Sequence, residues 1–456
     1  MRQANRLKRP GVGALALAGL ILLAAAAFIG SAAAESNALV TCRAELDRGV
    51  LIAGRSQRAV FKVTLDAAPV ETTTRASVNL SVVLDRSGSM RGEKLDKAIE
   101  AGVQALRRLN PKDIFSVVIF DHEVETIVPA QSASKVEWIE SRVRAIKARG
   151  NTALFAGVSR GAAEVRKNLS AGFTNRIILL SDGMANVGPG SPDDLGRLGA
   201  ALLKEDISVT TVGVGMDYNE DLMTRLARNS DGNSYFVEHA ADIPRVFTAE
   251  LGDVMSVAAK KVRIIIECSK GVRPVRIIGR EGRIKGENVE LSMHQLYGGQ
   301  QKYALVEVEV PEGAEGQTAE IACARVSYEN PLTGASGSVM STAKAGFSGN
   351  AEKVEKSANV SLQRDYTLNL NAVAQERAVA LADQGKKHEA VRELREAAGR
   401  LQEAGQRSSD SGLLEKAAEM EQTASRIERE GMNARDRKVF QTDSFQTKTQ
   451  QQLIVK

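Results

Sequence analysis

The chain contains little histidine and little cysteine: its 456 residues include four histidines and three cysteines. The histidines are scattered along the sequence, and no Cys-x-x-Cys or Cys/His spacing typical of zinc is present. This scarcity argues against a zinc protein and against chemistry that depends on a histidine pair. We expect each histidine to be a surface residue or a core residue with its polar groups satisfied (His122, His239, His294 and His388).

The net charge of +5 overstates how basic the chain is. Four positive charges fall in the first nine residues, and residues 10–34 carry none (Arg2, Arg6, Lys8 and Arg9). Without residues 1–34 the net charge is therefore +1, which is 5 minus 4. A nearly neutral remainder gives no reason to expect nucleic acid as a partner.

The first 34 residues are typical of an export signal. A basic start precedes an uncharged stretch over residues 11–34 that ends in three alanines. We expect either a signal peptide cleaved after Ala34 or, if it is not cleaved, a single N-terminal membrane anchor. In both cases the chain is exported, and residues 35–456 lie in the periplasm or outside the cell. In such an oxidising compartment Cys268 and Cys323 could pair, or each could be buried and unpaired; Cys42 is the third cysteine.

The segment 77–260 has the pattern of an α/β domain. Continuous apolar runs alternate with helical periods, such as Leu95, Ile99, Val103 and Leu106, which end before Asn110-Pro111. Strands that are apolar throughout are typical of a parallel sheet covered on both faces. The sequence therefore predicts a doubly wound, mostly parallel sheet.

Strand-like segments flank this domain at 35–76 and 261–348. Because neither segment alone supplies enough strands to bury two faces, we expect them to form one β-sandwich into which the α/β domain is inserted. The alternative is separate hairpins packed against the α/β domain. Residues 352–440 are predicted to be helical, with one tetratricopeptide-like hairpin that turns at Gly385 and buries Ala390, Leu394 and Ala397. Residues 441–456 read as a polar, disordered tail.

Five oxygen-bearing side chains are expected to meet at one edge of the predicted sheet. Asp85 and Asp182 each end a buried strand, and ligands bind beyond the carboxyl ends of such strands. Hard oxygen donors select Mg²⁺, with Mn²⁺ or Ca²⁺ as alternatives. We expect two serines to bind the ion directly, the threonine directly or through water, and the aspartates largely through water (Asp85, Ser87, Ser89, Thr152 and Asp182). The alternative is that the aspartates merely cap loops and helices.

Other residues near these five are given lesser roles. Gly88 stands between the serines, where we expect it to allow a tight turn and a close approach of the backbone to the ion. Asp121 and Asp217 also follow strands, and we expect both to lie in solvated loops; the alternative is that they rim the metal site. Ser87 is not surrounded by the Gly-x-Ser-x-Gly elbow of a serine nucleophile.

The motif Asp-Arg-Ser-Gly-Ser at residues 85–89, with Thr152 and Asp182, resembles the metal-ion-dependent adhesion site of von Willebrand factor type A domains. Phe120-Asp121, Ser-Asp-Gly at 181–183 and the glycine-rich run at 209–215 are also typical of that family. The resemblance covers residues 77–260 and implies a Rossmann-like fold, with residues 122–128 as an antiparallel edge strand. The flanking segments are similar to exported bacterial members, some of them labelled calcium-activated chloride channel homologues.

The resemblance implies a binding module: a bound cation coordinates a Glu or Asp side chain of a partner protein. No catalytic residue and no small-molecule substrate are then expected. One alternative is a Mg²⁺-dependent hydrolase or phosphotransferase with Asp85 as nucleophile. Against it, Ser87 stands where a second carboxylate would be needed, and the loop lacks a phosphate-binding lysine motif. Another alternative is a part in an envelope channel or transport complex. The sequence shows no apolar span beyond the N-terminal one, so the chain could not form a pore of helices by itself, and the role would be that of an accessory subunit.

Overall fold

The computed structural model describes residues 39–71, 75–170 and 172–451. The segment predicted to be a signal peptide or anchor, residues 1–34, lies outside the described residues. Within the described ranges no helix combines the length and the apolar character needed to cross a bilayer.

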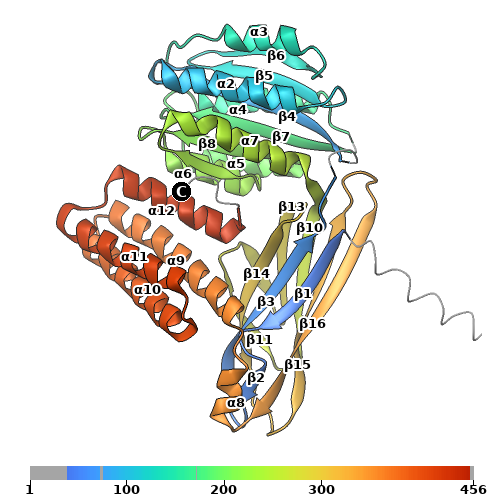
Figure 1. The fold of residues 1–456 in the computed structure, drawn as a ribbon, viewed down its shortest axis with the longest axis vertical. Helices are drawn as coiled ribbons and strands as arrows, with labels where there is room; N and C mark the ends of the chain where they lie inside the picture. The colour runs from blue at the N-terminus through green and yellow to red at the C-terminus, as the bar shows by residue number, and fades with distance from the viewer. Residues whose placement is uncertain (1–38, 72–74, 171, 452–456) are drawn as a thin grey trace, which may run out of the picture. The chain divides into compact units, whose positions relative to one another are not determined.

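A six-stranded sheet forms the centre of the α/β domain (Figure 1). Its order is β6-β5-β4-β7-β8-β9, and all neighbours are parallel except β5 and β6. The antiparallel edge strand expected near residues 122–128 is thus confirmed as β6. The strands are β4 (Ser77–Asp85), β5 (Ile114–Phe120), β6 (Val124–Ser132), β7 (Phe173–Ser181), β8 (Ile207–Val214) and β9 (Ser234–Val237).

Helices cover both faces of this sheet. Neighbouring strand residues point to opposite sides, and because the strands are apolar throughout, both faces must be buried. Val82 packs with one apolar cluster, which includes residues of α2, α3 and α7, and Val83 packs with a second cluster built on α4, α5 and α6. The predicted helix that ends before Asn110 is α2. The bounds are α2 (Glu93–Arg108), α3 (Val136–Arg144), α4 (Leu154–Arg166), α5 (Pro192–Lys204), α6 (Glu220–Asn229) and α7 (Ile243–Met255).

Strands from both sides of the α/β domain share two further sheets. One has the order β1-β3-β14-β11 and the other β12-β13-β10-β15-β16-β2. The expected fold class, a doubly wound sheet inserted in a β-sandwich and followed by helices, is therefore confirmed. The strands are β1 (Val40–Leu46), β2 (Val50–Ile52), β3 (Gln57–Ala67), β10 (Val257–Cys268), β11 (Arg273–Ile278), β12 (Gly282–Lys285), β13 (Asn288–Tyr297), β14 (Gln301–Val310), β15 (Thr318–Glu329) and β16 (Ser336–Ser348).

Of the two alternatives left open for Cys268 and Cys323, the disulfide is wrong and both residues are unpaired. All three cysteines are free thiols. In the antiparallel pair β10 and β15, Cys268 stands opposite Ala322 and Cys323 stands opposite Glu267. The two cysteines are thus one position out of register, so their side chains point to opposite faces of the sheet and a disulfide between them is geometrically excluded.

The helical region is larger than the sequence indicated. The predicted hairpin at Gly385 (φ +75°) joins α9 to α10, and Ala390, Leu394 and Ala397 are buried, as expected. Two more helices follow it: α11 lies within the predicted helical region, 352–440, and α12 begins there but continues to Thr449. The bounds are α8 (Ala351–Lys356), α9 (Val360–Asp383), α10 (Lys387–Ser408), α11 (Ser411–Glu430) and α12 (Ala434–Thr449).

The expectation of disorder from residue 441 is wrong for residues 441–449. These residues belong to α12, whose N-terminus is closed by a capping box between Asn433 and Asp436. Phe440 and Phe445 are buried. The Ser, Thr and Asp content of this segment disfavours an isolated helix, and burial against the rest of the protein overrides that weak local preference.

Candidate metal site

Asp85 and Asp182 lie at the same edge of the α/β sheet because β4 and β7 are parallel neighbours in register. Both carboxylates are buried. Asp85 is held at both oxygens: Oδ1 accepts a hydrogen bond from the Ser87 N–H (2.7 Å), and Oδ2 accepts one from the Ser181 hydroxyl (2.5 Å). The strand ends therefore present two buried carboxylates, one of which has a fixed orientation.

The serine loop, residues 86–92 between β4 and α2, links these two carboxylates. A single 3₁₀ turn, η1 (Gly88–Met90), follows β4, and buried Met90 anchors it in the apolar core. The Ser87 and Ser89 hydroxyl oxygens are 3.1 Å apart, and the Ser89 hydroxyl donates to Asp182 Oδ1 (2.7 Å). Four of the five predicted ligands are thus joined in one group of oxygen atoms.

Thr152 reaches the group from the threonine loop, residues 145–153 between α3 and α4. This loop is fixed to the serine loop by a hydrogen bond from the Gly88 N–H to the Gly150 carbonyl (3.0 Å). Gly183 shows how near the threonine lies: a Cβ added to Gly183 would be 2.8 Å from Thr152 Oγ1 and 3.5 Å from Asp85 Oδ2. A glycine at position 183 therefore keeps open the space between the threonine hydroxyl and the first carboxylate.

The expectation for Gly88 is not supported. Its φ is not in the left-handed region, and a Cβ there would make an ordinary contact of 3.6 Å with the Gly150 carbonyl. The residue that needs glycine is Gly150, whose φ of +73° is strained for other residues. The tight turn thus belongs to the threonine loop.

Asp121 is not in a solvated loop, contrary to expectation. It is fully buried at the end of β5, and its Oδ2 accepts hydrogen bonds from Arg86 Nε (2.7 Å) and Arg149 Nε (2.9 Å). Its carbonyl accepts from the Ala153 N–H (2.7 Å). Since Arg86 lies in the serine loop and Arg149 in the threonine loop, Asp121 fixes both loops that carry predicted ligands. The other residue expected in a solvated loop, Asp217, is exposed.

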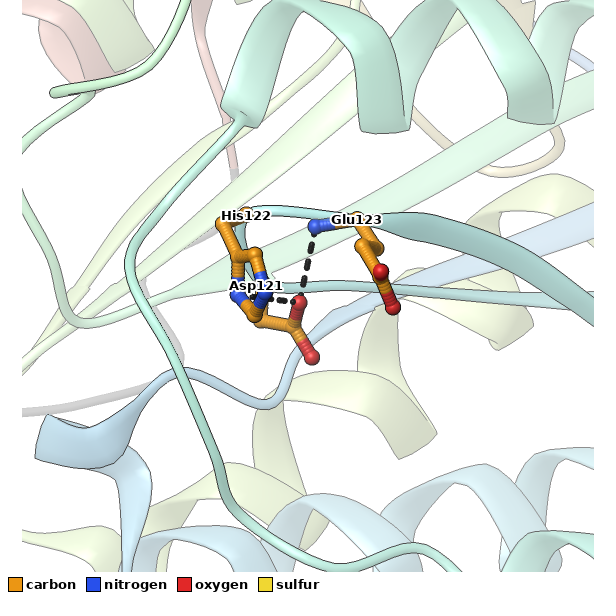
Figure 2. Close-up of side chains that lie close together, drawn as sticks. All are labelled: Asp121, His122 and Glu123. Carbon is orange, nitrogen blue, oxygen red and sulfur yellow. Dashed lines mark hydrogen bonds and ion pairs between the residues drawn. The ribbon is translucent and has the colours of Figure 1, made fainter.

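A second group of possible metal ligands lies next to this anchor (Figure 2). Ligand atoms of Asp121, His122 and Glu123 lie within 4.8 Å of one another. The Asp121 carboxylate is already bound by two guanidinium groups, however, and Glu123 pairs with Arg149 (2.6 Å). Two positive charges at these carboxylates disfavour a further cation, so this group acts as an ion-pair anchor.

The electrostatics of the oxygen group suit a hard cation. Burial raises the pKa of Asp85 to about 6, and the nearby Asp182 carboxylate also raises it, while hydrogen bonds from Ser181 and Ser87 lower it. Two buried carboxylates side by side need a positive charge. Two carboxylates and three hydroxyls are all oxygen donors, the set that Mg²⁺, Mn²⁺ or Ca²⁺ binds, so the residues present fit the ion.

Sequence reasoning missed a positive charge at the site. Lys94, in the first turn of α2, donates to Asp182 Oδ2 at 2.5 Å. It also missed the contact of Ser181 with Asp85 and the burial of Asp121. The signal for Lys94 was its place one helical turn after the serine loop, where a side chain of α2 can reach back to that loop.

Comparison with known proteins finds one matching family model and related bacterial sequences. The family model for the von Willebrand factor type A domain matches residues 79–249. The chain is 25% identical to the uncharacterized protein sll0103 of Synechocystis over 63% of its own length and 69% of that relative. It is 27% identical to the uncharacterized protein YfbK of Escherichia coli, over 50% of this chain but only 40% of that relative.

Two solved structures share most of the fold. The von Willebrand factor type A protein from Catenulispora acidiphila aligns with a TM-score of 0.64 at 17% identity, over 83% of this chain and 90% of that one. The ArnB paralog VWA2 from Sulfolobus acidocaldarius aligns with a TM-score of 0.58 at 17% identity, over 91% and 99%. At this identity the likeness is one of fold. With the matched family model, it establishes that this chain contains a von Willebrand factor type A domain.

Proposed function

We propose that this protein is an exported binding module in which a divalent cation, with Mg²⁺ first in order, is held by the oxygen group and coordinates a Glu or Asp side chain of a partner protein. The observation that carries the proposal is the meeting of serine, threonine and aspartate oxygens from three separate loops at one sheet edge (Asp85, Ser87, Ser89, Thr152 and Asp182).

The charge balance supports a recognition role. Asp85 is tied at both oxygens by protein groups, so it contributes charge more readily than a direct bond to the ion. A cation whose direct protein ligands are largely neutral hydroxyls stays electrophilic and can accept one more anionic oxygen. A carboxylate from a partner supplies that oxygen.

The same contacts weigh against the hydrolase alternative. A nucleophilic carboxylate needs an oxygen free to attack, yet both oxygens of Asp85 accept short hydrogen bonds from Ser87 and Ser181. We therefore propose no catalytic residue and no small-molecule substrate. No observation on the described residues favours the alternative of an accessory channel subunit. The proposal of export depends on residues 1–34, which lie outside the described residues.

The first test is metal binding by the full chain. We expect Mn²⁺ and Mg²⁺ to bind with one ion per chain in titration calorimetry, and Asp85→Ala to abolish the binding. Asp217→Ala is the matched control, because Asp217 is an exposed aspartate that follows a neighbouring strand. Equal binding by wild type and Asp85→Ala would place the ion elsewhere and overturn the proposal.

The second test addresses the carboxylate. Water-proton relaxation measures how many water molecules remain on a bound Mn²⁺ ion. We expect added glutarate to displace water from the Mn²⁺-loaded protein, and glutaramide, which has the same length without charge, to have no such effect. If the two compounds act alike, the ion does not recognise carboxylates.

A further inference from the structure

Lys94 places a positive charge directly on the candidate metal site. Its Nζ lies 2.5 Å from Asp182 Oδ2, while the other oxygen of that carboxylate accepts the Ser89 hydroxyl. The Asp182 side chain is fully buried, whereas that of Lys94 is 28% exposed. An ammonium group thus reaches from the rim of the site onto a carboxylate that has no access to water.

A buried carboxylate needs a counter-charge, and the Lys94 ammonium supplies it. A divalent ion bound to the serine hydroxyls would be drawn to the same carboxylate. Two positive charges within a few ångströms in a partly buried site repel each other strongly. The ammonium and the metal ion therefore cannot both be held there at full strength.

We infer that Lys94 is an internal cation that competes with the divalent metal ion for Asp182, so that metal binding is coupled to displacement of the Lys94 side chain. This inference rests on the proposed function, because it concerns the same site. It assigns Lys94 a role in setting metal affinity.

The surroundings of Lys94 give the displaced side chain somewhere to go. The residue lines a hollow of about 460 Å³, whose walls include Glu93, Val214 and Glu238. Glu93 can receive the ammonium, whereas Glu238 is already paired with Arg435 (3.0 Å). Gly215, with φ +72°, borders its present position: a Cβ there would lie 3.3 Å from Lys94 Nζ. The space around the ammonium is thus kept free by a glycine on one side and a hollow on the other.

The consequence is a trade between stability and affinity. While Lys94 contacts Asp182, that carboxylate keeps a counter-charge at low metal concentration. Metal binding is weaker as a result, because the ion must displace the ammonium group. Without the lysine charge, the site depends on the metal ion for its stability. Lys94 should therefore reduce both the metal affinity and the rise in melting temperature that metal binding produces.

The experiment compares full-length wild type with Lys94→Met and uses Mn²⁺ alone as the probe. We expect the dissociation constant from electron paramagnetic resonance titration to fall about tenfold or more in Lys94→Met, since removing one adjacent charge is worth at least that factor. The melting temperature without metal should fall, and its rise on adding Mn²⁺ should exceed that of wild type. Lys97→Met is the matched control: it removes the same charge from the next turn, where Lys97 pairs with Glu100.

Two more variants keep the test decisive. Lys94→Gln removes the charge but keeps an N–H donor for Asp182, so it replaces Lys94→Met if that variant does not fold. Lys94→Arg keeps the charge and should not gain affinity. A gain in Lys94→Arg would mean that side-chain shape, not charge, sets the affinity, which overturns the inference.

The outcomes separate the inference from the proposed function. Equal affinity in wild type and both charge-removing variants overturns the inference and leaves the metal site standing. Binding by the variants but not by wild type supports the inference and overturns a metal-dependent function for the natural protein. Absence of binding in every variant overturns both.

Discussion

Arg86 and Asp121 form a buried ion pair, with Arg86 Nε 2.7 Å from Asp121 Oδ2. The pair joins the loop after β4 to the end of β5. The backbone repeats the connection, because the Arg86 N–H donates to the Phe120 carbonyl and its own carbonyl accepts from the Arg149 N–H. The serine loop and the threonine loop are therefore held to each other through one carboxylate.

Replacing this carboxylate should weaken both loops. In Asp121→Asn the Arg86 guanidinium, 9% exposed, loses its buried partner and keeps only the exposed Glu125 carboxylate, 3.6 Å away. We expect a loss of about 3 to 5 kcal/mol in unfolding free energy, the range for breaking a buried ion pair, together with weaker Mn²⁺ binding. Chemical denaturation and metal titration measure the two effects.

Arg149→Gln provides the control for this change. Arg149 pairs with the same aspartate, but its side chain is 52% exposed, so removing it should cost at most about 1 kcal/mol. If Asp121→Asn were no more harmful than Arg149→Gln, the buried pair would not be what fixes the loops.

A methyl group at Gly183 should block the metal site with little damage to the fold. The added Cβ would lie 2.8 Å from Thr152 Oγ1, which forces the threonine hydroxyl away from the oxygen group. We expect Gly183→Ala to lower Mn²⁺ affinity by about a hundredfold, since displacement of a ligand by about an ångström is costly at such sites. Circular dichroism should show an unchanged fold.

The neighbouring glycine of the serine loop offers a matched comparison. Gly88→Ala adds the same methyl group within the motif but meets only an ordinary contact of 3.6 Å. We expect its metal affinity to stay within about threefold of wild type. Equal losses in both alanine variants would contradict the assignment of Gly183 as the residue that keeps the site open.

The attachment of α12 should depend strongly on Glu220, whose buried carboxylate pairs with both Arg437 and Lys438 of that helix. Lys438 is 2% exposed, and its Nζ contacts Glu220 Oε2 (2.6 Å) and the Tyr218 carbonyl (2.8 Å) of the α/β domain. In Glu220→Gln the ammonium loses its counter-charge, which we expect to cost about 3 kcal/mol. Amide hydrogen exchange in α12 should then become about a hundredfold faster.

The double variant Glu220→Gln with Lys438→Met serves as its control. Removing both charges leaves no unpaired buried ion, so protection of the α12 amides should return in part. If exchange in α12 does not change in the single variant, the pair does not hold the helix.

Stability should respond to pH through Asp253, near the end of α7. Burial raises the pKa of this carboxyl to about 7; Glu250 adds to the rise, and Arg176 and Lys302 oppose it. The folded-state pKa lies above the usual value near 3.9, so folding favours the protonated form of Asp253. The contribution of this group to the free energy of unfolding is therefore complete below about pH 4 and is lost as pH rises through about 7. Asp253→Asn removes this loss.

We therefore expect Asp253→Asn to raise stability by a few kcal/mol at pH 8, at about 1.4 kcal/mol for each pKa unit, and by much less at pH 5. Melting curves at both pH values test this, with exposed Asp217→Asn as the control. A gain of the same size at both pH values would rule out titration of Asp253 as its cause.

Much of the α/β domain could be predicted from local patterns. The alternation of wholly apolar strands with amphipathic helices requires a sheet covered on both faces, and Val82 and Val83 do enter opposite cores. Asp85 and Asp182 end parallel strands in register, so their meeting at one edge follows from topology alone.

The sequence by itself therefore determined the sheet, the edge where the oxygen ligands gather and their chemical type, because strand period and strand ends are local properties. Only the tertiary structure decided which charges meet: Lys94 on Asp182, Arg86 on Asp121, and Lys438 of α12 on Glu220. It also decided that Cys268 and Cys323 face away from each other. These contacts depend on register and on packing between distant segments, and one residue's shift in a strand reverses the direction of its side chain.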